Sequence, residues 1–327
     1  MKVLVTSKSF GRVAPDAIET LKANGIEVVW GSKPSMTAKE IAAEIAGFDA
    51  LIVGNETVDA SVFAAADQLQ LVHMHGTGLD AIDVSAATDK GVLVANAPGA
   101  NRNAVAELTL ALMLVAARAI DKHIEILKAG RWERSAGYEI SGKTVGILGL
   151  GNVGKRIVEL LSGFGVQITA FDVLPDREWC ARSGVSLATS ADEVFAKADF
   201  LVLALSLNSQ TRGIVDARRL ALMKRNAYLI NTARGGLVDD EALCAALHDK
   251  RIAGAALDAF DPEPLPRDSC LRDIGITLTP HLAATSVEAA GNVSRIVARN
   301  VVDVLVHGRR ECAVNAAAGI RFHDKVA

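Results

Sequence analysis

The segment from Thr144 to Gly154 constrains the fold of this chain more than any other stretch. It reads Thr-Val-Gly-Ile-Leu-Gly-Leu-Gly-Asn-Val-Gly, so a short apolar run leads into G-x-G-x-x-G at Gly149, Gly151 and Gly154. In a strand–turn–helix unit, the first glycine permits a tight turn and the second lets the backbone approach a pyrophosphate. The third lets the helix pack close to the strand. The helix N-terminus then presents free N–H groups and the positive end of its dipole to the phosphates.

A second apolar stretch, residues 166–171, ends at Asp172. This acid lies about twenty residues beyond the glycines, where a carboxylate can accept hydrogen bonds from ribose hydroxyls. The glycine pattern alone is weak, because glycine-rich turns are common. With a strand before it, a helix after it and the acid in place, it predicts a dinucleotide site rather than an ordinary strand–turn–helix connection.

The first hundred residues alternate between apolar strand-like runs and helix-like runs. The predicted strands are residues 3–6, 26–30, 50–53, 69–74 and 92–95, and the predicted helices are 15–24, 37–46 and 60–66. Such alternation predicts a parallel sheet with helices on both faces. This segment has no glycine-rich dinucleotide turn, so we expect a separate small doubly wound domain.

The alternation resumes after the glycine turn, with predicted strands at 200–205, 227–230, 254–257 and 276–278 and helices between them, such as 217–223 and 240–248. With the two strands at the glycine turn this gives six parallel strands, as in dinucleotide-binding domains. Between the two domains, Asn103 is expected to cap a helix that runs to about Leu127. Because this helix is apolar on most of its circumference, it is expected to be buried or to lie at a subunit contact. Together with Arg131-Trp132 it indicates a homodimer.

Composition excludes several other classes of function. The chain has 327 residues, of which 50% are hydrophobic, and a net charge of -3, so it offers no electrostatic case for nucleic acid or an anionic membrane. Its N-terminus lacks the apolar core of a signal peptide, and its most apolar helix is too short to span a bilayer. The four cysteines, Cys180, Cys244, Cys270 and Cys312, have no metal-like spacing. We therefore expect reduced thiols, no bound metal and a cytoplasmic protein.

Three polar residues follow the last three predicted strands of the second domain. Arg234, Glu263 and His281 each come just past the carboxyl end of a strand. Each alone is more easily explained as a surface arginine, a solvated acid or a structural histidine. The carboxyl ends of parallel strands meet at one edge of the sheet, where the nicotinamide is expected to lie. Three such residues at that edge favour a shared catalytic role.

Their chemistry fits the interconversion of a 2-hydroxy acid and its 2-oxo acid. The planar guanidinium of Arg234 can hold a carboxylate by two hydrogen bonds. His281 can give a proton to the carbonyl oxygen as hydride arrives, or take it from the hydroxyl in the reverse direction. Glu263 can bond the other ring nitrogen and stabilise the imidazolium. The hydride transfer itself belongs to the nicotinamide cofactor, NAD.

In the first domain, the strand that ends near Met74 runs into His75-Gly-Thr-Gly-Leu-Asp80. The turn Gly76-Thr77-Gly78 can offer backbone N–H groups to a substrate carboxylate, or it can be a plain tight connection. His73 and His75 are expected to be packing or surface histidines.

Taken together, these motifs resemble the D-isomer-specific 2-hydroxyacid dehydrogenases. The resemblance covers nearly the whole chain and rests on Gly76-Thr-Gly-Leu-Asp, Asn96 to Glu107, Gly146 to Gly154, Asn231-Thr-Ala-Arg-Gly-Gly, Leu257-Asp-Ala-Phe and Pro280-His281. It implies a Rossmann cofactor domain, residues 99–286, inserted into a flavodoxin-like substrate domain made of residues 1–98 and 287–327. The latter includes a returning helix at 287–306. It also implies a dimer.

The family's site residues carry over by position. Arg234, Glu263 and His281 match its catalytic arginine, glutamate and histidine. The resemblance implies that Asn152 and Val153 meet the pyrophosphate, that Asp172 meets the adenosine ribose, and that Thr232 and Asp258 lie on the nicotinamide side. It further implies that Thr77 and Gly78 contact substrate or nicotinamide.

Departures from the family pattern bear on the substrate. Phosphoglycerate-specific relatives place basic residues near the positions of Gly54 and Met74, which favours a small unphosphorylated acid such as glyoxylate or hydroxypyruvate. A D-3-phosphoglycerate dehydrogenase is the alternative within enzymes. Formate-oxidising relatives have an amide in place of the glutamate, so Glu263 argues against formate. The strand that ends Leu203-Ala-Leu-Ser-Leu also lacks the family's usual histidine or threonine before proline. An alternative of another class is an NAD-sensing, corepressor-like binding protein.

Overall fold

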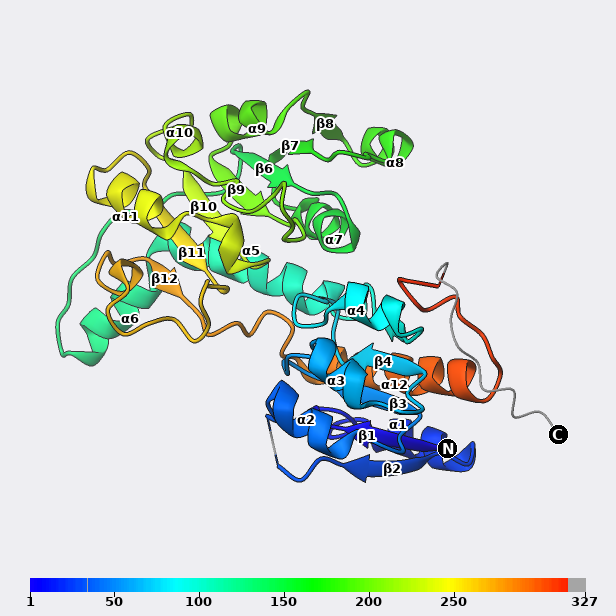
Figure 1. The fold of residues 1–327 in the computed structure, drawn as a ribbon. Coiled ribbons are helices and arrows are strands. Elements are labelled where there is room, and N and C mark those ends of the chain that lie inside the picture. Colours follow the sequence, from blue (N-terminus) through cyan, green and yellow to red (C-terminus); the bar gives the residue numbers. More distant parts are fainter. Residues whose placement is uncertain (34, 317–327) are drawn as a thin grey trace. The chain divides into compact units, whose positions relative to one another are not determined.

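The computed structural model describes residues 1–33 and 35–316, which form two compact units (Figure 1). Unit 1 comprises the described residues of Met1–Asn101 and of the chain from Thr285 to residue 316, and unit 2 comprises Arg102–Ala284. Each unit is built on one parallel sheet, so the predicted fold class is confirmed. The expected domains, 99–286 inserted into 1–98 and 287–327, stay a prediction, and segment 317–327 is outside the described residues.

Unit 1 has a five-stranded sheet in the order β2-β1-β3-β4-β5, the flavodoxin-like order. Its elements are β1 (Lys2–Val5), α1 (Pro15–Ala23), β2 (Glu27–Trp30), α2 (Ala38–Glu44), β3 (Ala50–Val53), α3 (Ala60–Ala65), β4 (Leu71–Met74), α4 (Val84–Asp89), β5 (Leu93–Ala95) and α12 (Val287–Leu305). The central strands β3 and β4 are buried along their whole length because helices cover both faces. The returning helix α12 packs on α1, with Arg295 and Asp16 paired at 2.7 Å.

Unit 2 has a seven-stranded sheet in the order β12-β11-β10-β9-β6-β7-β8. Its elements are α5 (Arg102–Arg118), α6 (Ile120–Lys128), β6 (Thr144–Leu148), α7 (Asn152–Leu161), β7 (Gln167–Phe171), α8 (Arg177–Arg182), β8 (Val185–Leu187), α9 (Ala191–Lys197), β9 (Phe200–Leu203), α10 (Ala217–Leu220), β10 (Tyr228–Asn231), η1 (Gly235–Leu237), α11 (Asp240–His248), β11 (Gly254–Leu257), η2 (Cys270–Arg272) and β12 (Thr277–Leu278). The strand order changes direction between β6 and β9, so the glycine turn after β6 lies at the topological switch point.

Six strands were predicted for this sheet, and the structure has seven. The additional strand, β8, is only three residues long and pairs with β7 at the edge of the sheet. Only Val185 of its three residues is buried. So short a run gives almost no sequence signal.

The single long helix predicted from Asn103 to Leu127 is wrong. The chain forms two helices, α5 and α6, whose axes meet at 63°. They separate at Ala119, which has a φ of 48° in the left-handed region and therefore ends the regular hydrogen-bond ladder. Asn103 lies inside the first turn and is not the cap, because α5 begins at Arg102. Among the described helices, none is by itself long and apolar enough to cross a membrane, although α5 and α6 pass that test when counted together.

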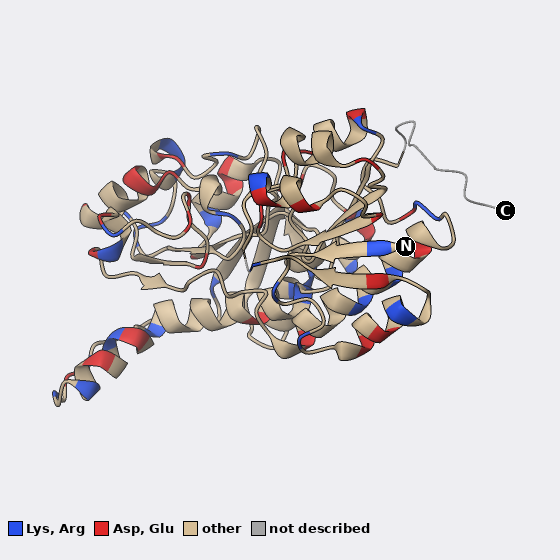
Figure 2. Ribbon diagram, turned by 60° about the horizontal axis from the view of Figure 1, so that its bottom comes forward, with Lys and Arg blue, Asp and Glu red and all other residues tan. Residues whose placement is uncertain are grey.

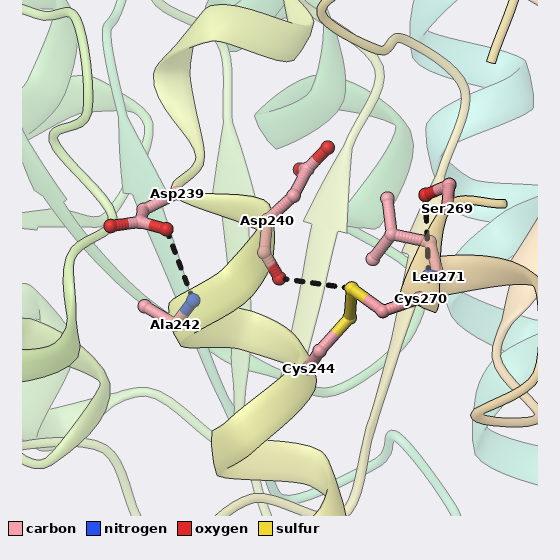
Figure 3. Close-up of a disulfide and its surroundings, with 7 residues drawn as sticks. All are labelled: Asp239, Asp240, Ala242, Cys244, Ser269, Cys270 and Leu271. Carbon is pink, nitrogen blue, oxygen red and sulfur yellow. Dashed lines mark hydrogen bonds between the residues drawn. A yellow bond between two sulfur atoms is a disulfide. The ribbon is translucent and has the colours of Figure 1, made fainter. Parts of the chain in front are cut away.

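Two cysteines that were expected to be free thiols are joined. Cys244 in α11 and Cys270 in η2 form a disulfide whose Cα atoms lie 6.3 Å apart (Figure 3). The expectation failed because 26 residues separate the two in sequence, and only the packing of α11 against η2 brings them together. Cys180 and Cys312 are free.

Candidate active site

The glycine turn joins β6 to α7 in unit 2. Gly149 has a φ of +94°, and its N–H donates to the carbonyl of Phe171 over 2.9 Å, which holds the turn against the end of β7. Gly151 is the N-cap of α7. A side chain at Gly154 would place its Cβ 2.1 Å from the Gly149 carbonyl oxygen, so only glycine allows this approach of helix to turn. No heavy atom lies within 4 Å of the Cβ position at Gly151, so a phosphate can approach the backbone there.

Asp172 lies directly after β7, beside this turn. One carboxylate oxygen accepts from the N–H of Leu150 over 2.7 Å, and the other accepts from the N–H of Leu174 over 2.8 Å. These bonds fix the carboxylate next to the glycines. Since each carboxylate oxygen can accept more than one hydrogen bond, Asp172 retains capacity for ribose hydroxyls. Asn152 and Val153 form the first turn of α7 beside it. The turn and its acid fit a dinucleotide.

Arg234 follows β10 in a turn organised by Asn231. The buried Asn231 amide donates to the Arg234 carbonyl over 2.9 Å, and its oxygen accepts from the Ala233 N–H over 3.0 Å. The guanidinium of Arg234 is half-buried and donates to the Ala233 carbonyl over 2.8 Å. Sequence reasoning gave Asn231 no role, although a polar residue at the end of a buried strand was a usable signal.

Thr232, in the same turn, is buried and bonded to α5. Thr109 donates its hydroxyl proton to the Val105 carbonyl over 2.7 Å. A hydroxyl carries one proton, so the 2.6 Å contact between the two threonine oxygens must be a hydrogen bond from Thr232 to Thr109. Thr232 can therefore serve a ligand only as an acceptor. Thr109 was also missed by sequence reasoning, because its position in a helix carried no signal.

Glu263 and His281 are in direct contact. The Nδ1 atom of His281 lies 2.9 Å and 2.8 Å from the two oxygens of the Glu263 carboxylate. Glu263 also accepts from the N–H of Phe260 over 2.9 Å, which fixes its orientation. Both side chains are about two-fifths exposed, at 37% and 41%, so the pair is open to a ligand. Since the glutamate occupies Nδ1, Nε2 is the nitrogen left for proton exchange.

Asp258 supports the segment that carries His281. Its carboxylate is fully buried and accepts from the Thr279 hydroxyl over 2.6 Å and from the N–H groups of Leu282 and Ala283 over 2.9 Å and 2.8 Å. His281 itself has a φ of 49°, a conformation that costs energy for a non-glycine residue and must be held by its surroundings. The structure thus gives Asp258 a positioning role.

The arginine turn touches the segment that carries the glutamate. The Cβ position at Gly235 lies 1.9 Å from the Phe260 carbonyl carbon and 2.4 Å from the Asp261 nitrogen. Only a glycine permits this contact, which places the residue after Arg234 against the backbone that orients Glu263. Asp261, the other acid on this segment, pairs with Arg212 at 2.8 Å, whereas Glu263 contacts His281.

In unit 1, the Gly76-Thr77-Gly78 turn follows β4 and is half-buried. The Asn96 amide donates to the Thr77 carbonyl over 2.6 Å, and the Ala97 N–H donates to the Gly76 carbonyl over 2.8 Å. His73 is fully buried with both ring nitrogens bonded, to the Met74 carbonyl and to Asn300, and burial lowers its pKa to about 4. It is a packing residue.

The strand order, the glycine turn and Asp172 define unit 2 as a dinucleotide-binding domain, and the same unit holds the Glu263–His281 contact, which is suited to proton transfer. Residues 110–283 match the model of the family described as D-isomer specific 2-hydroxyacid dehydrogenase, NAD binding domain. The chain belongs to this family of NAD-dependent oxidoreductases, so the resemblance predicted from the sequence is confirmed.

Individual relatives agree with this assignment. A D-3-phosphoglycerate dehydrogenase of Methanocaldococcus jannaschii is 39% identical over 96% of this chain and 59% of its own length. A crystal structure of a protein from Thermus thermophilus is 31% identical with a TM-score of 0.86, covering 96% of this chain and 100% of that one. A glyoxylate reductase from Paecilomyes thermophila is 27% identical with the same TM-score and covers 96% and 98%. The chain spans less than two thirds of the length of the curated relatives it matches.

Proposed function

We propose that the protein interconverts a D-2-hydroxy acid and its 2-oxo acid with NAD. The observation that carries this proposal is the Glu263–His281 pair, with Nδ1 2.8 Å from the carboxylate, in the same unit as the glycine turn. The nicotinamide, when bound, supplies or accepts the hydride at the second carbon of the acid. In our proposal unit 2 holds the cofactor and unit 1, with Thr77 and Gly78, contributes to substrate binding.

Each catalytic residue has a distinct task in the proposed mechanism. Arg234 binds the substrate carboxylate through its guanidinium and so aligns the carbonyl group. In the direction of reduction, protonated His281 gives its Nε2 proton to the carbonyl oxygen as that oxygen gains negative charge. Glu263 stabilises the imidazolium through Nδ1 and fixes the ring. In oxidation, neutral His281 takes the hydroxyl proton.

Two substrate classes are candidates. The names of the curated relatives favour 3-phosphoglycerate, and this support is stronger than that for the glyoxylate or hydroxypyruvate expected from the sequence. Two observations keep the unphosphorylated class as the second candidate. The fold is shared with a glyoxylate reductase, and Gly54 and Met74 stand where basic residues are expected for a phosphate.

A panel of 2-oxo acids with NADH and NADPH, followed at the nicotinamide absorbance, tests the function. It should include glyoxylate, hydroxypyruvate and 3-phosphohydroxypyruvate. Reduction of at least one of these acids would support the proposed dehydrogenase function. Tight NADH binding without turnover of any acid would favour the corepressor-like sensor instead.

The cofactor preference depends on Asp172. We expect NAD(H) to be used with higher kcat/KM than NADP(H), because the Asp172 carboxylate repels a 2′-phosphate while accepting ribose hydroxyls. Asp172→Ala should reduce the ratio of kcat/KM with NAD(H) to kcat/KM with NADP(H), without abolishing turnover. The measurement is kcat/KM with both cofactors. Equal efficiency of the wild-type protein with the two cofactors would contradict the assignment.

The carboxylate-binding role of Arg234 predicts that Arg234→Lys is a severe change. Lysine keeps the charge but lacks the planar fork that holds a carboxylate by two bonds. We expect kcat to fall as well as KM to rise, because the carbonyl is no longer aligned for hydride transfer. Steady-state kinetics check this. Near-normal values would mean that the carboxylate is held elsewhere, for example by the backbone of Gly76 to Gly78.

We also propose a homodimer in which α6 takes part. Three large apolar side chains of this helix, Ile120, Ile124 and Leu127, are between 40% and 59% exposed. Charged residues of both signs share the same helix, at the lower left of Figure 2. An exposed apolar stripe on a helix with a charged opposite side is typical of a contact with another chain.

A further inference from the structure

A buried acid lies at the edge of the unit 1 sheet where β3 ends. Glu56 is only 9% exposed, and its Oε2 accepts from the N–H of Gly54 over 2.6 Å. A Cβ on Gly54 would lie 3.2 Å from the Ser7 hydroxyl and 3.3 Å from the same glutamate oxygen. The carboxylate is thus in close contact with the position that a Cβ on residue 54 would occupy. Sequence reasoning gave Glu56 no role.

This position belongs to the ligand edge of the sheet. β3 pairs with β4, and the N–H of His75 donates to the Val53 carbonyl over 2.7 Å, so the segment after β3 lies beside the one after β4. The latter leads into Gly76-Thr77-Gly78, the proposed substrate turn. Ligands of doubly wound sheets bind beyond the carboxyl ends of the strands.

Glu56 has no basic partner among the described residues. Within residues 1–33 and 35–316, no lysine, arginine or histidine forms an ion pair with Glu56. The nearby His75 supplies no counter-charge, because burial lowers its pKa to about 4. Ser294 donates to the Ala290 carbonyl and must therefore accept from His75 Nε2 over 2.8 Å. In the neutral ring Nδ1 carries no proton, so it accepts from the Ser9 hydroxyl over 2.9 Å.

We propose that Glu56 determines which substrates are accepted, selecting 2-oxo acids whose third carbon carries a hydrogen-bond donor, a hydroxyl or an amine, over those carrying a phosphate. A buried carboxylate with one N–H partner favours a further donor, and it opposes a second anion. The inference rests on the proposed dehydrogenase function. Of its two substrate candidates, it favours the unphosphorylated class against the names of the relatives.

The test compares kcat/KM for hydroxypyruvate, 3-phosphohydroxypyruvate and glyoxylate in the wild-type protein and in Glu56→Gln. The amide oxygen of glutamine can still accept from Gly54, so the change removes the charge and retains the local hydrogen bond. We expect the wild-type protein to prefer hydroxypyruvate over its phosphate by about 10–100-fold, the worth of a hydrogen bond to a charged group. Glu56→Gln should reduce this preference by about tenfold, mainly through KM.

Glyoxylate provides the internal control, because it has no third carbon. Its loss of kcat/KM in Glu56→Gln should be smaller than that of hydroxypyruvate. Asp59→Asn removes a neighbouring charge at the start of α3 and should leave the substrate ratio unchanged.

Three outcomes would overturn the proposal: wild-type preference for the phosphorylated acid, an equal loss with all three substrates in Glu56→Gln, or an unchanged ratio in a folded Glu56→Gln. The first needs no variant, so a misfolded Glu56→Gln protein leaves the test intact. Failure to reduce any of the acids would instead refute the dehydrogenase function itself.

Discussion

His281→Ala is expected to lower kcat/KM for 2-oxo acid reduction by about 10²–10⁴-fold, the usual contribution of a positioned acid. The carbonyl oxygen gains negative charge as hydride arrives, and without the imidazolium it must take its proton from water. Binding of NADH should change little, because the glycine turn and Asp172 are untouched. Steady-state kinetics and a fluorescence titration of NADH measure the two effects. A variant that retains more than a tenth of the activity would exclude His281 as the acid.

The pH profile separates the role of Glu263 from that of His281. Reduction needs the protonated histidine, so we expect it to decline at alkaline pH, while oxidation improves over the same range. The Glu263 carboxylate lies 2.8 Å from Nδ1 of His281 and can stabilise the imidazolium by its charge. Glu263→Gln keeps a hydrogen-bonding group without the charge and should therefore move the alkaline limb of reduction to lower pH. An unmoved limb would show that the carboxylate does not act through His281. Asp261 would then be the next carboxylate to test, although it is paired with Arg212 at 2.8 Å.

Gly235→Ala is expected to damage both stability and catalysis. The new methyl group would lie 1.9 Å from the Phe260 carbonyl carbon, and the contact is with backbone, which cannot rotate away as a side chain can. Overpacking of this kind costs about 1–3 kcal/mol or more in the free energy of unfolding. The segment that must move also orients Glu263, so a shift near 1 Å should cost about 10²-fold in kcat/KM.

A matched substitution controls for this effect. Gly163 has no heavy atom within 4 Å of its Cβ position and has no positive φ, so Gly163→Ala should change the unfolding free energy by less than about 0.5 kcal/mol. Thermal unfolding and kcat/KM of the two variants are measured side by side. Wild-type stability and activity in Gly235→Ala would mean that the backbone at Phe260 is more adaptable than the structure shows.

Features encoded within a short stretch were predictable from the sequence. The glycine turn of Gly149 to Gly154 and the two parallel sheets follow from local composition and strand–helix alternation. The contact between Glu263 and His281 was also predicted, because residues after adjacent parallel strands meet at one edge. The break at Ala119 was not, since alanine strongly favours helix and nothing in the sequence signals its positive φ.

Features that depend on packing between distant segments were missed. Three such features are the Cys244–Cys270 disulfide, the hydrogen bonds from the His281 segment to Asp258, and the burial of Glu56. Each depends on which segments pack together, which the sequence does not show. Glu56 in particular reads as an ordinary loop acid, and only its burial and its bond to Gly54 distinguish it.

The disulfide makes part of the site a covalent macrocycle. The ring closed by Cys244 and Cys270 contains β11, Asp258 and Glu263, whereas His281 lies outside it. In the unfolded chain such a ring has fewer conformations than an open segment, and for 26 residues the loss corresponds to about 3.5 kcal/mol in favour of the folded state. The residue proposed to orient the catalytic histidine is therefore held in a segment that cannot fully open even when its secondary structure is lost.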